Sequence, residues 1–210
     1  MAGTATNFNQ EVIRAGSAAQ IWAGLAVPGA GAKLLLDANG TPDATANPNA
    51  LHLGLTRAGA TLTLSTSGTE DFFADEQVVA VHSIPGTADA SIAAEFLQVF
   101  DMDIMAILSP NTGTPFAGAA VTGPPALPAF EGLTFGDKAI AYTSIAVIFP
   151  VQGYTNRFAV WHLYKTYNQD GVSFVVDRKG MSGTSATFKG FGITTRAAND
   201  TVGAWWFETT

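Results

Sequence analysis

The acidic run Glu70-Asp71-Phe72-Phe73-Ala74-Asp75-Glu76 is the densest charge feature of the chain. Carboxylates at this density can hold a hard cation or line an acidic channel, but the run lacks the alternating oxygen ligands and the glycine of a calcium loop. A metal site is therefore disfavoured. Two interpretations remain equally open: a solvated turn between strands, or an acidic lining. The adjacent Phe72 and Phe73 are unusual for a solvated turn, so one of them is expected to pack against the protein or a subunit.

The three histidines give no sign of a metal or catalytic site. His52, His82 and His162 lie far apart, and none has the spacing of metal ligands. His162 lies among aromatic residues in a predicted strand, which favours a hydrogen-bonded core histidine or an interface residue. The sequence does not favour a catalytic triad, an alternative that would need residues distant in the chain to meet in the fold.

Short motifs that would hold a nucleophile or a phosphate are also missing. Gly183-Thr184-Ser185 does not complete a nucleophile elbow. Gly29-Ala30-Gly31-Ala32-Lys33 has glycines and a lysine without the spacing of a phosphate loop, so it predicts a turn. We therefore expect no enzymatic activity, no cofactor and no bound metal.

Trp205, Trp206 and Phe207 near the C-terminus could form a platform for a sugar ligand. Aromatic residues are also common where strands pair and where subunits meet. We favour a core or interface role, and we assign Phe72, Phe73, Trp161, Trp205 and Trp206 to a subunit interface as a hypothesis.

The composition indicates a protein whose surface is covered by other protein. Of the 210 residues, 47% are hydrophobic and 13% are charged, whereas soluble domains carry about 25% charged residues. The apolar stretch Ile21 to Leu36 contains Pro28, Gly29, Gly31 and Lys33, so it does not predict a membrane-spanning helix. No secretory signal is visible. Burial against other copies is the favoured explanation.

The charge balance limits the possible partners. The net charge of −7 gives no basic surface for binding nucleic acid, although DNA could pass by without adhering. The chain has no cysteine, which excludes disulfides and thiolate metal sites. This fits assembly in a reducing cytoplasm.

Dense turn residues between short alternating runs predict a mainly β fold, a β-sandwich or half-barrel with one flanking α-helix and long loops. We expect one domain over 1–210, divided into an N-terminal arm and long loop (1–50), strands plus a helix (51–109), a Gly/Pro-rich loop (110–130) and C-terminal strands (131–210). The spacing of apolar residues predicts the helix over Leu97–Leu108, closed by Pro110. Strands are predicted over 21–25, 33–36, 60–65, 77–84, 90–96, 139–149, 157–167, 172–177, 185–195 and 201–208.

The predicted strand Arg157 to Tyr167 is apolar on both faces. Phe158, Val160, His162 and Tyr164 share one face, and Ala159, Trp161 and Leu163 share the other. Such a strand is expected in a sandwich or barrel that is covered on both sides.

The order of these features resembles that of tail tube proteins of long-tailed bacteriophages. The resemblance rests on Leu53 to Leu64, on the acidic corner Phe73-Ala74-Asp75-Glu76-Gln77, on the strand Ala90 to Phe96 leading into the helix, and on the closing strands from Arg157. It covers most of the chain from about residue 50 onward. It leaves 1–50 and Pro110 to Pro128 unexplained.

The resemblance implies rings of copies, six in this family, whose inner strands join into a barrel around a lumen. Rings stack into the tail tube of the virion, in contact with other tail proteins, and DNA passes through without specific binding. An acidic lumen would repel phosphate, so we expect Glu70, Asp71, Asp75 and Glu76 to border the lumen or the ring-to-ring contact. We also expect Pro110 to Pro128 or Val27 to Asn49 to reach a neighbouring copy.

Two alternatives stay open. Another virion component, such as a tail terminator, a head decoration protein or a capsid subunit, would share the low charge and the many interfaces. A carbohydrate-binding β-sandwich adhesin would use the tryptophans as its sugar platform.

Overall fold

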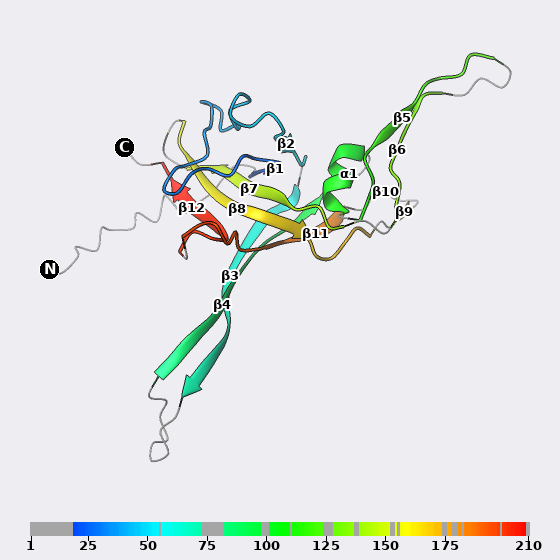
Figure 1. Cartoon of the computed structure of the whole chain (residues 1–210). Helices are drawn as coiled ribbons and strands as arrows, with labels where there is room; N and C mark the ends of the chain where they lie inside the picture. Colours follow the sequence, from blue (N-terminus) through cyan, green and yellow to red (C-terminus); the bar gives the residue numbers. More distant parts are fainter. Residues whose placement is uncertain are drawn as a thin grey trace.

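The computed structural model describes most of the chain from Ala19 to Glu208. The described residues are 19–54, 56–72, 82–97, 101–109, 111–123, 128–136, 139–151, 154, 156–173, 176–177, 180–181, 183–197 and 199–208. They form a mainly β protein with one short helix (Figure 1).

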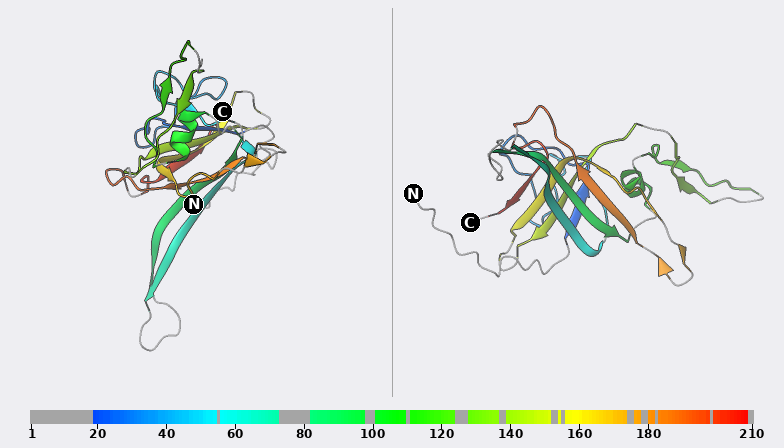
Figure 2. Two further views of the ribbon diagram at one scale, coloured as in Figure 1. Left: turned by 90° about the vertical axis from the view of Figure 1, so that its right-hand side faces the viewer. Right: turned by 90° about the horizontal axis from the view of Figure 1, so that it is seen from below.

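One antiparallel sheet makes the body. Its strand order is β2-β1-β7-β8-β11-β4-β3, and β12 also pairs with β8. The strands cross one another as the sheet curves into a half-barrel (Figure 2), which is one of the two forms expected from the sequence. The strand bounds are β1 Gln20–Ala23, β2 Leu51–His52, β3 Thr56–Phe72, β4 His82–Phe96, β7 Thr143–Pro150, β8 Phe158–Asn168, β11 Thr184–Gly190 and β12 Gly203–Phe207.

Strand β8 is the centre of the sheet and is buried on both faces, as its sequence predicts. Leu163 belongs to a large apolar cluster on one face, and Phe158 and Val160 belong to a second cluster on the other face. A β-bulge interrupts the alternation: Ile145 pairs with Leu163, but Thr143 pairs with Thr166. The extra residue in β8 shifts every later side chain to the opposite face.

Helix α1 (Met102–Leu108) covers the face of the larger cluster through Ile104 and Leu108. The Asp101 carboxylate caps it by accepting hydrogen bonds from the amides of Asp103 (2.9 Å) and Ile104 (3.2 Å). At its end, the buried Asn168 donates to the carbonyl oxygen of Leu108 at 2.6 Å. This bond ties the last helical turn to strand β8.

The opposite face of the sheet is covered by the long segment between β1 and β2. Its Leu25 and Leu34 are buried against Ile148 and Val160 in the second cluster. The segment is mostly loop, as predicted, with a single β-bridge between Leu36 and Pro42. The expected strand Lys33–Leu36 is therefore wrong, because Leu36 alone of these residues forms a β-bridge.

Two ribbons project from the body (Figure 1). One is the β3–β4 hairpin, which pairs from Thr56↔Phe96 out to Phe72↔His82. The other is built from β5 (Phe116–Gly118) and β6 (Phe130–Gly132). A small third pair, β9 (Val176–Asp177) and β10 (Gly180–Met181), completes the β structure of the described residues.

Several predicted bounds are corrected by the structure. The helix begins at Met102 and not at Leu97. Phe96 belongs to β4, where it pairs with Thr184 and Thr56, and Asp101 is the N-cap of the helix. Strand β11 ends at Gly190, short of Thr195, where the chain turns toward Arg196. The predicted strand 60–65 is part of a much longer strand, β3, and the predicted strand 172–177 is reduced to Val176–Asp177 among its described residues. The described residues of the Pro110 to Pro128 segment contain β5 and are therefore not loop throughout.

Candidate assembly surfaces

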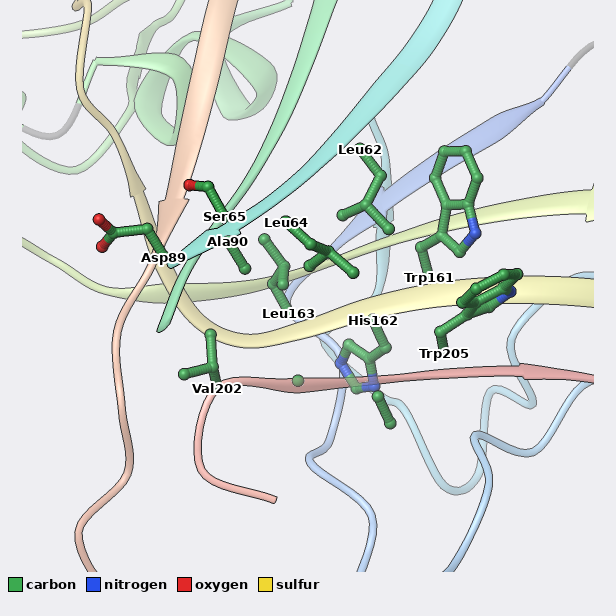
Figure 3. Close-up of a pocket in the computed structure, with 12 residues that line it drawn as sticks. Leu62, Leu64, Ser65, Asp89, Ala90, Trp161, His162, Leu163, Val202 and Trp205 are labelled. Atoms are coloured by element: carbon green, nitrogen blue, oxygen red, sulfur yellow. The ribbon is translucent and has the colours of Figure 1, made fainter. Parts of the chain in front are cut away.

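The sheet splits along one side of β8. The first half of β8 pairs with β12, whereas its end pairs with β11, through Gly190↔Thr166 to Phe188↔Asn168. Strand β11 then holds β4, but only over Ser91–Phe96. The rest of β4 and the free edge of β12 therefore diverge, and an apolar groove of about 360 Å³ lies between them (Figure 3).

The groove is lined by leucines from the hairpin and tryptophans from the split strands. Leu62 and Leu64 come from β3, Trp161 and Leu163 from β8, and Trp205 from β12. Leu64 is 64% exposed and Trp205 is 65% exposed. Asp89 is the one charged residue among the described lining residues. Its Oδ1 lies 3.8 Å from Lys189 Nζ.

The structure brings two of the predicted interface tryptophans together and separates the third. Trp161 and Trp205 are direct partners across β8 and β12, and both line the groove (Figure 3). Trp161 also packs edge-on against Phe149, with the ring centroids 5.0 Å apart. Trp206 lies opposite Val160 and packs against the second cluster on the other face.

The described part of the acidic run, Glu70 to Phe72, lies at the far end of the projecting hairpin. Glu70, Asp71 and Phe72 are the last three residues of β3, and they pair in register with Ile84, Ser83 and His82. These residues thus belong to a strand and not to a turn. Phe73, Asp75 and Glu76 lie outside the described residues, so their predicted roles at the lumen or interface remain predictions.

The β5–β6 ribbon presents a pair of exposed phenylalanines. The rings of Phe116 (47% exposed) and Phe130 (57% exposed) meet edge-to-face with centroids 6.1 Å apart. Each ring covers a glycine of the paired strand: a Cβ on Gly118 would lie 2.2 Å from the Phe130 ring, and one on Gly132 would lie 2.6 Å from the Phe116 ring. The glycines therefore hold both rings flat on one face of the ribbon.

Sequence reasoning missed these phenylalanines and the exposure of Leu64. A signal for the first was present, since Phe116-Ala117-Gly118 and Phe130-Glu131-Gly132 repeat the same Phe-X-Gly pattern. Leu64 shares its strand face with Leu62 as predicted, but the divergence of the hairpin from β12 leaves it uncovered. That divergence has no signal in the sequence.

His162 is buried on the face opposite the helix, 1% exposed, between Tyr164 and Trp206. Burial, and secondly the positive charge of Arg196, lower the pKa of its imidazole to about 4. Neither ring nitrogen has a hydrogen-bond partner in the described part of the chain. The expectation of a hydrogen-bonded core histidine is therefore wrong, and no described carboxylate or hydroxyl is placed to make this imidazole a general base.

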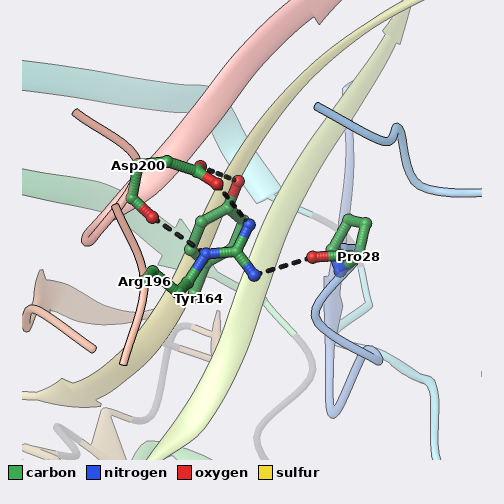
Figure 4. A network of polar contacts seen from close by, with 4 residues as sticks. All are labelled: Pro28, Tyr164, Arg196 and Asp200. Carbon is green, nitrogen blue, oxygen red and sulfur yellow. Dashed lines mark hydrogen bonds and ion pairs between the residues drawn. The ribbon is translucent and has the colours of Figure 1, made fainter. Parts of the chain in front are cut away.

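A polar network beside His162 fastens two loops together (Figure 4). Arg196 forms an ion pair with Asp200 and donates to the carbonyl oxygen of Pro28 at 2.8 Å. The Tyr164 hydroxyl donates to Asp200 at 2.9 Å, and Arg196 lies over the Tyr164 ring. Burial, with the bond to Asp200, raises the pKa of Tyr164 to about 12. The network joins the β11–β12 connection to the loop that covers the second cluster.

A second ion pair holds the C-terminal end. Lys33 Nζ lies 2.7 Å from Glu208 Oε1, and the other carboxylate oxygen accepts from the amide of Phe158 at 3.1 Å. Lys33 comes directly after a turn at Gly29 to Ala32, and this turn was predicted from the sequence. The lysine thus serves as an ion-pair partner of the chain's own carboxylate.

Within the described residues, no group of three or more His, Asp or Glu side chains is placed to hold a metal ion. The helix of the described chain is too short to cross a membrane. His52 is paired edge-on with Trp22, far along the chain from His162, and His82 lies at the outer end of β4.

No protein family model matches the chain, and no curated protein matches it in sequence.

Proposed function

We propose that this chain is a structural subunit that assembles with copies of itself, and more specifically that it is a tail tube protein of a long-tailed bacteriophage. The observation that carries the proposal is the outer half of the β3–β4 hairpin. From Leu64↔Ala90 to Phe72↔His82 these strands pair only with each other among the described residues, and they extend beyond the body (Figure 2).

Such a ribbon needs partners. A two-stranded ribbon is marginally stable alone, and its unpaired backbone groups are templates for pairing with other chains. Hairpins from neighbouring copies, joined edge to edge, would satisfy these groups and close a barrel around a lumen. That arrangement is the one implied by the resemblance to tail tube proteins.

The surface composition supports the same proposal. Only 13% of the residues are charged, and large apolar side chains such as Leu64, Phe130, Phe135 and Trp205 are more than half exposed. Exposed apolar groups that gather on projections and in a groove mark contact surfaces. In the proposed assembly they are covered by other copies in the virion, after assembly in the host cytoplasm.

Electron microscopy of negatively stained protein, with light scattering alongside, tests this function. Rings or hollow tubes of uniform diameter are expected. A protein that remains monomeric at all concentrations would overturn the proposal. Single rings that never elongate would instead favour a tail terminator, and glycan binding by a stable monomer would favour the adhesin.

The acidic run gives a second test of the tail tube. Neutral replacements of Glu70, Asp71, Asp75 and Glu76 together are expected to leave the subunit folded and to impair DNA passage or ring stacking, since an acidic lining repels phosphate. Tubes of the variant that form and conduct DNA as wild-type tubes do would show that the run has neither role.

A further inference from the structure

Among the described residues, neither Phe116 nor Phe130 of the β5–β6 ribbon belongs to an apolar cluster of the body. Both rings are about half exposed, and each is held in place by a glycine of the paired strand. A short two-stranded ribbon is not expected to hold exposed aromatic rings in order without a further contact. The ribbon is therefore shaped to meet another surface.

The groove between the β3–β4 hairpin and β12 has the matching properties. Its open side is bordered by Leu64 and Trp205, and its wall is formed by Trp161 and Leu163. The β3–β4 hairpin borders the groove, and in Figure 1 this hairpin and the β5–β6 ribbon point to different ends of the molecule. Because an apolar projection and an apolar groove at separate ends form a head-to-tail contact, they link copies into a ring or a filament.

We infer that the Phe116/Phe130 face of one copy binds in the groove bordered by Leu64 and Trp205 of the next copy. This inference rests on the proposed self-assembly and names the surfaces that meet. It also assigns a role to the segment around Pro110 to Pro128, which the resemblance to tail tube proteins leaves unexplained.

The size of the contact favours a repeating partner over a single foreign one. With a full aromatic side chain contributing roughly 200 Å², the exposed parts of Phe116, Phe130, Leu64 and Trp205 amount to roughly 450 Å². That is about a third of a standard stable interface. One such contact is too weak for a lasting pair, but the same contact repeated around a ring adds to those of the hairpins.

The chemistry of the groove favours an apolar segment over a sugar. The other described lining residues with polar side chains are Ser65, Asp89 and His162, and the His162 ring is buried in the protein. Sugar hydroxyls placed in it would find few hydrogen-bond partners. The phenyl rings of the ribbon need none.

Two double variants test the contact. The ribbon variant is Phe116→Ser with Phe130→Ser, and the groove variant is Leu64→Ser with Trp205→Ser. All four positions are about half exposed or more, so both variants are expected to remain folded, which circular dichroism checks. Ile140→Ser with Tyr154→Ser is the matched control, since Ile140 (42% exposed) and Tyr154 (46% exposed) lie outside both surfaces.

Sedimentation velocity at a concentration where the wild type assembles gives the readout. Each double variant alone is expected to raise the concentration needed for assembly at least tenfold, and the control is expected to assemble normally. Mixed together, the ribbon variant supplies an intact groove and the groove variant an intact ribbon. The mixture should therefore show more association than either variant alone and should not elongate as the wild type does.

A glycine pair tests the role of ring placement. A Cβ at Gly132 would lie 2.6 Å from the Phe116 ring, so Gly132→Val would displace that ring, whereas a Cβ at Gly136 would meet no atom within 4 Å. Gly132→Val should weaken assembly, and Gly136→Val should not.

The outcomes separate this inference from the function on which it rests. If the wild type assembles and both double variants assemble equally well, the contact is wrong and self-assembly stands. If the wild type never associates, the proposed function fails and the inference with it. Glycan binding abolished by Trp205→Ser would assign the groove to a sugar and would also overturn the inference.

Discussion

The pH dependence of folding at His162 gives the sharpest prediction about stability. The imidazole is almost fully buried, and its pKa falls from the ordinary value of 6.5 to about 4. The unfolded chain therefore binds a proton at a pH where the folded chain does not. The contribution of His162 to the free energy of unfolding is fully present above pH 6.5, and it is lost as the pH falls from 6.5 toward 4.

The magnitude follows from the two pKa values. A difference between 6.5 and about 4 corresponds to a loss of roughly 3 kcal/mol of unfolding free energy when the pH has fallen below both values. The slope in between is about 1.4 kcal/mol for each pH unit. His162→Phe removes the titrating group and should flatten this part of the curve.

Urea unfolding between pH 4 and 7.5, at a protein concentration below that needed for assembly, measures the effect. The quantity to follow is the difference in unfolding free energy between the wild type and His162→Phe at each pH. Asp200 and Glu208 also have lowered pKa values and also reduce stability as the pH falls, and their effect cancels in this difference. His52→Phe serves as the control, since that ring is less deeply buried. Parallel curves for His162 and His162→Phe would refute the reasoning, as would a His162 pKa near 6.5 by NMR.

Two further predictions concern the polar contacts that hold the body together. Arg196→Ala should lower the free energy of unfolding by about 2 kcal/mol, because it removes the charged hydrogen bond to the Pro28 carbonyl oxygen. Lys33→Ala should lower it by less than about 0.5 kcal/mol, because the Lys33 side chain is 57% exposed. Equal changes in the urea midpoint of the two variants would contradict this prediction. Asn168→Ala should lower the free energy of unfolding by roughly 3 kcal/mol, because it removes the side-chain partner of the Leu108 and Gly171 carbonyl oxygens and of the Thr187 amide. The control Asn39→Ala, on an exposed turn, should leave the urea midpoint unchanged.

The sequence determined the class of the fold because side-chain alternation is a local property. Residues 158–163 alternate between two apolar faces, so a strand covered on both sides could be predicted before any partner strand was known. The helix was found from its spacing for the same reason. Its first residue was missed, because the pairing of Phe96 with Thr184 comes from a segment far along the chain.

Only the tertiary structure decided which surfaces lie open. Leu62 and Leu64 share one face in any straight strand, but Leu64 becomes exposed because β4 leaves β11 at Ser91 while β12 follows β8. The bulge in β8 likewise moves Tyr167 to the opposite face from the one that simple alternation would give. Of the three tryptophans Trp161, Trp205 and Trp206, the first two thus line the groove and the third is partly buried against the second cluster. Burial depends on which strands meet and at what angle, and that depends on the whole sheet at once.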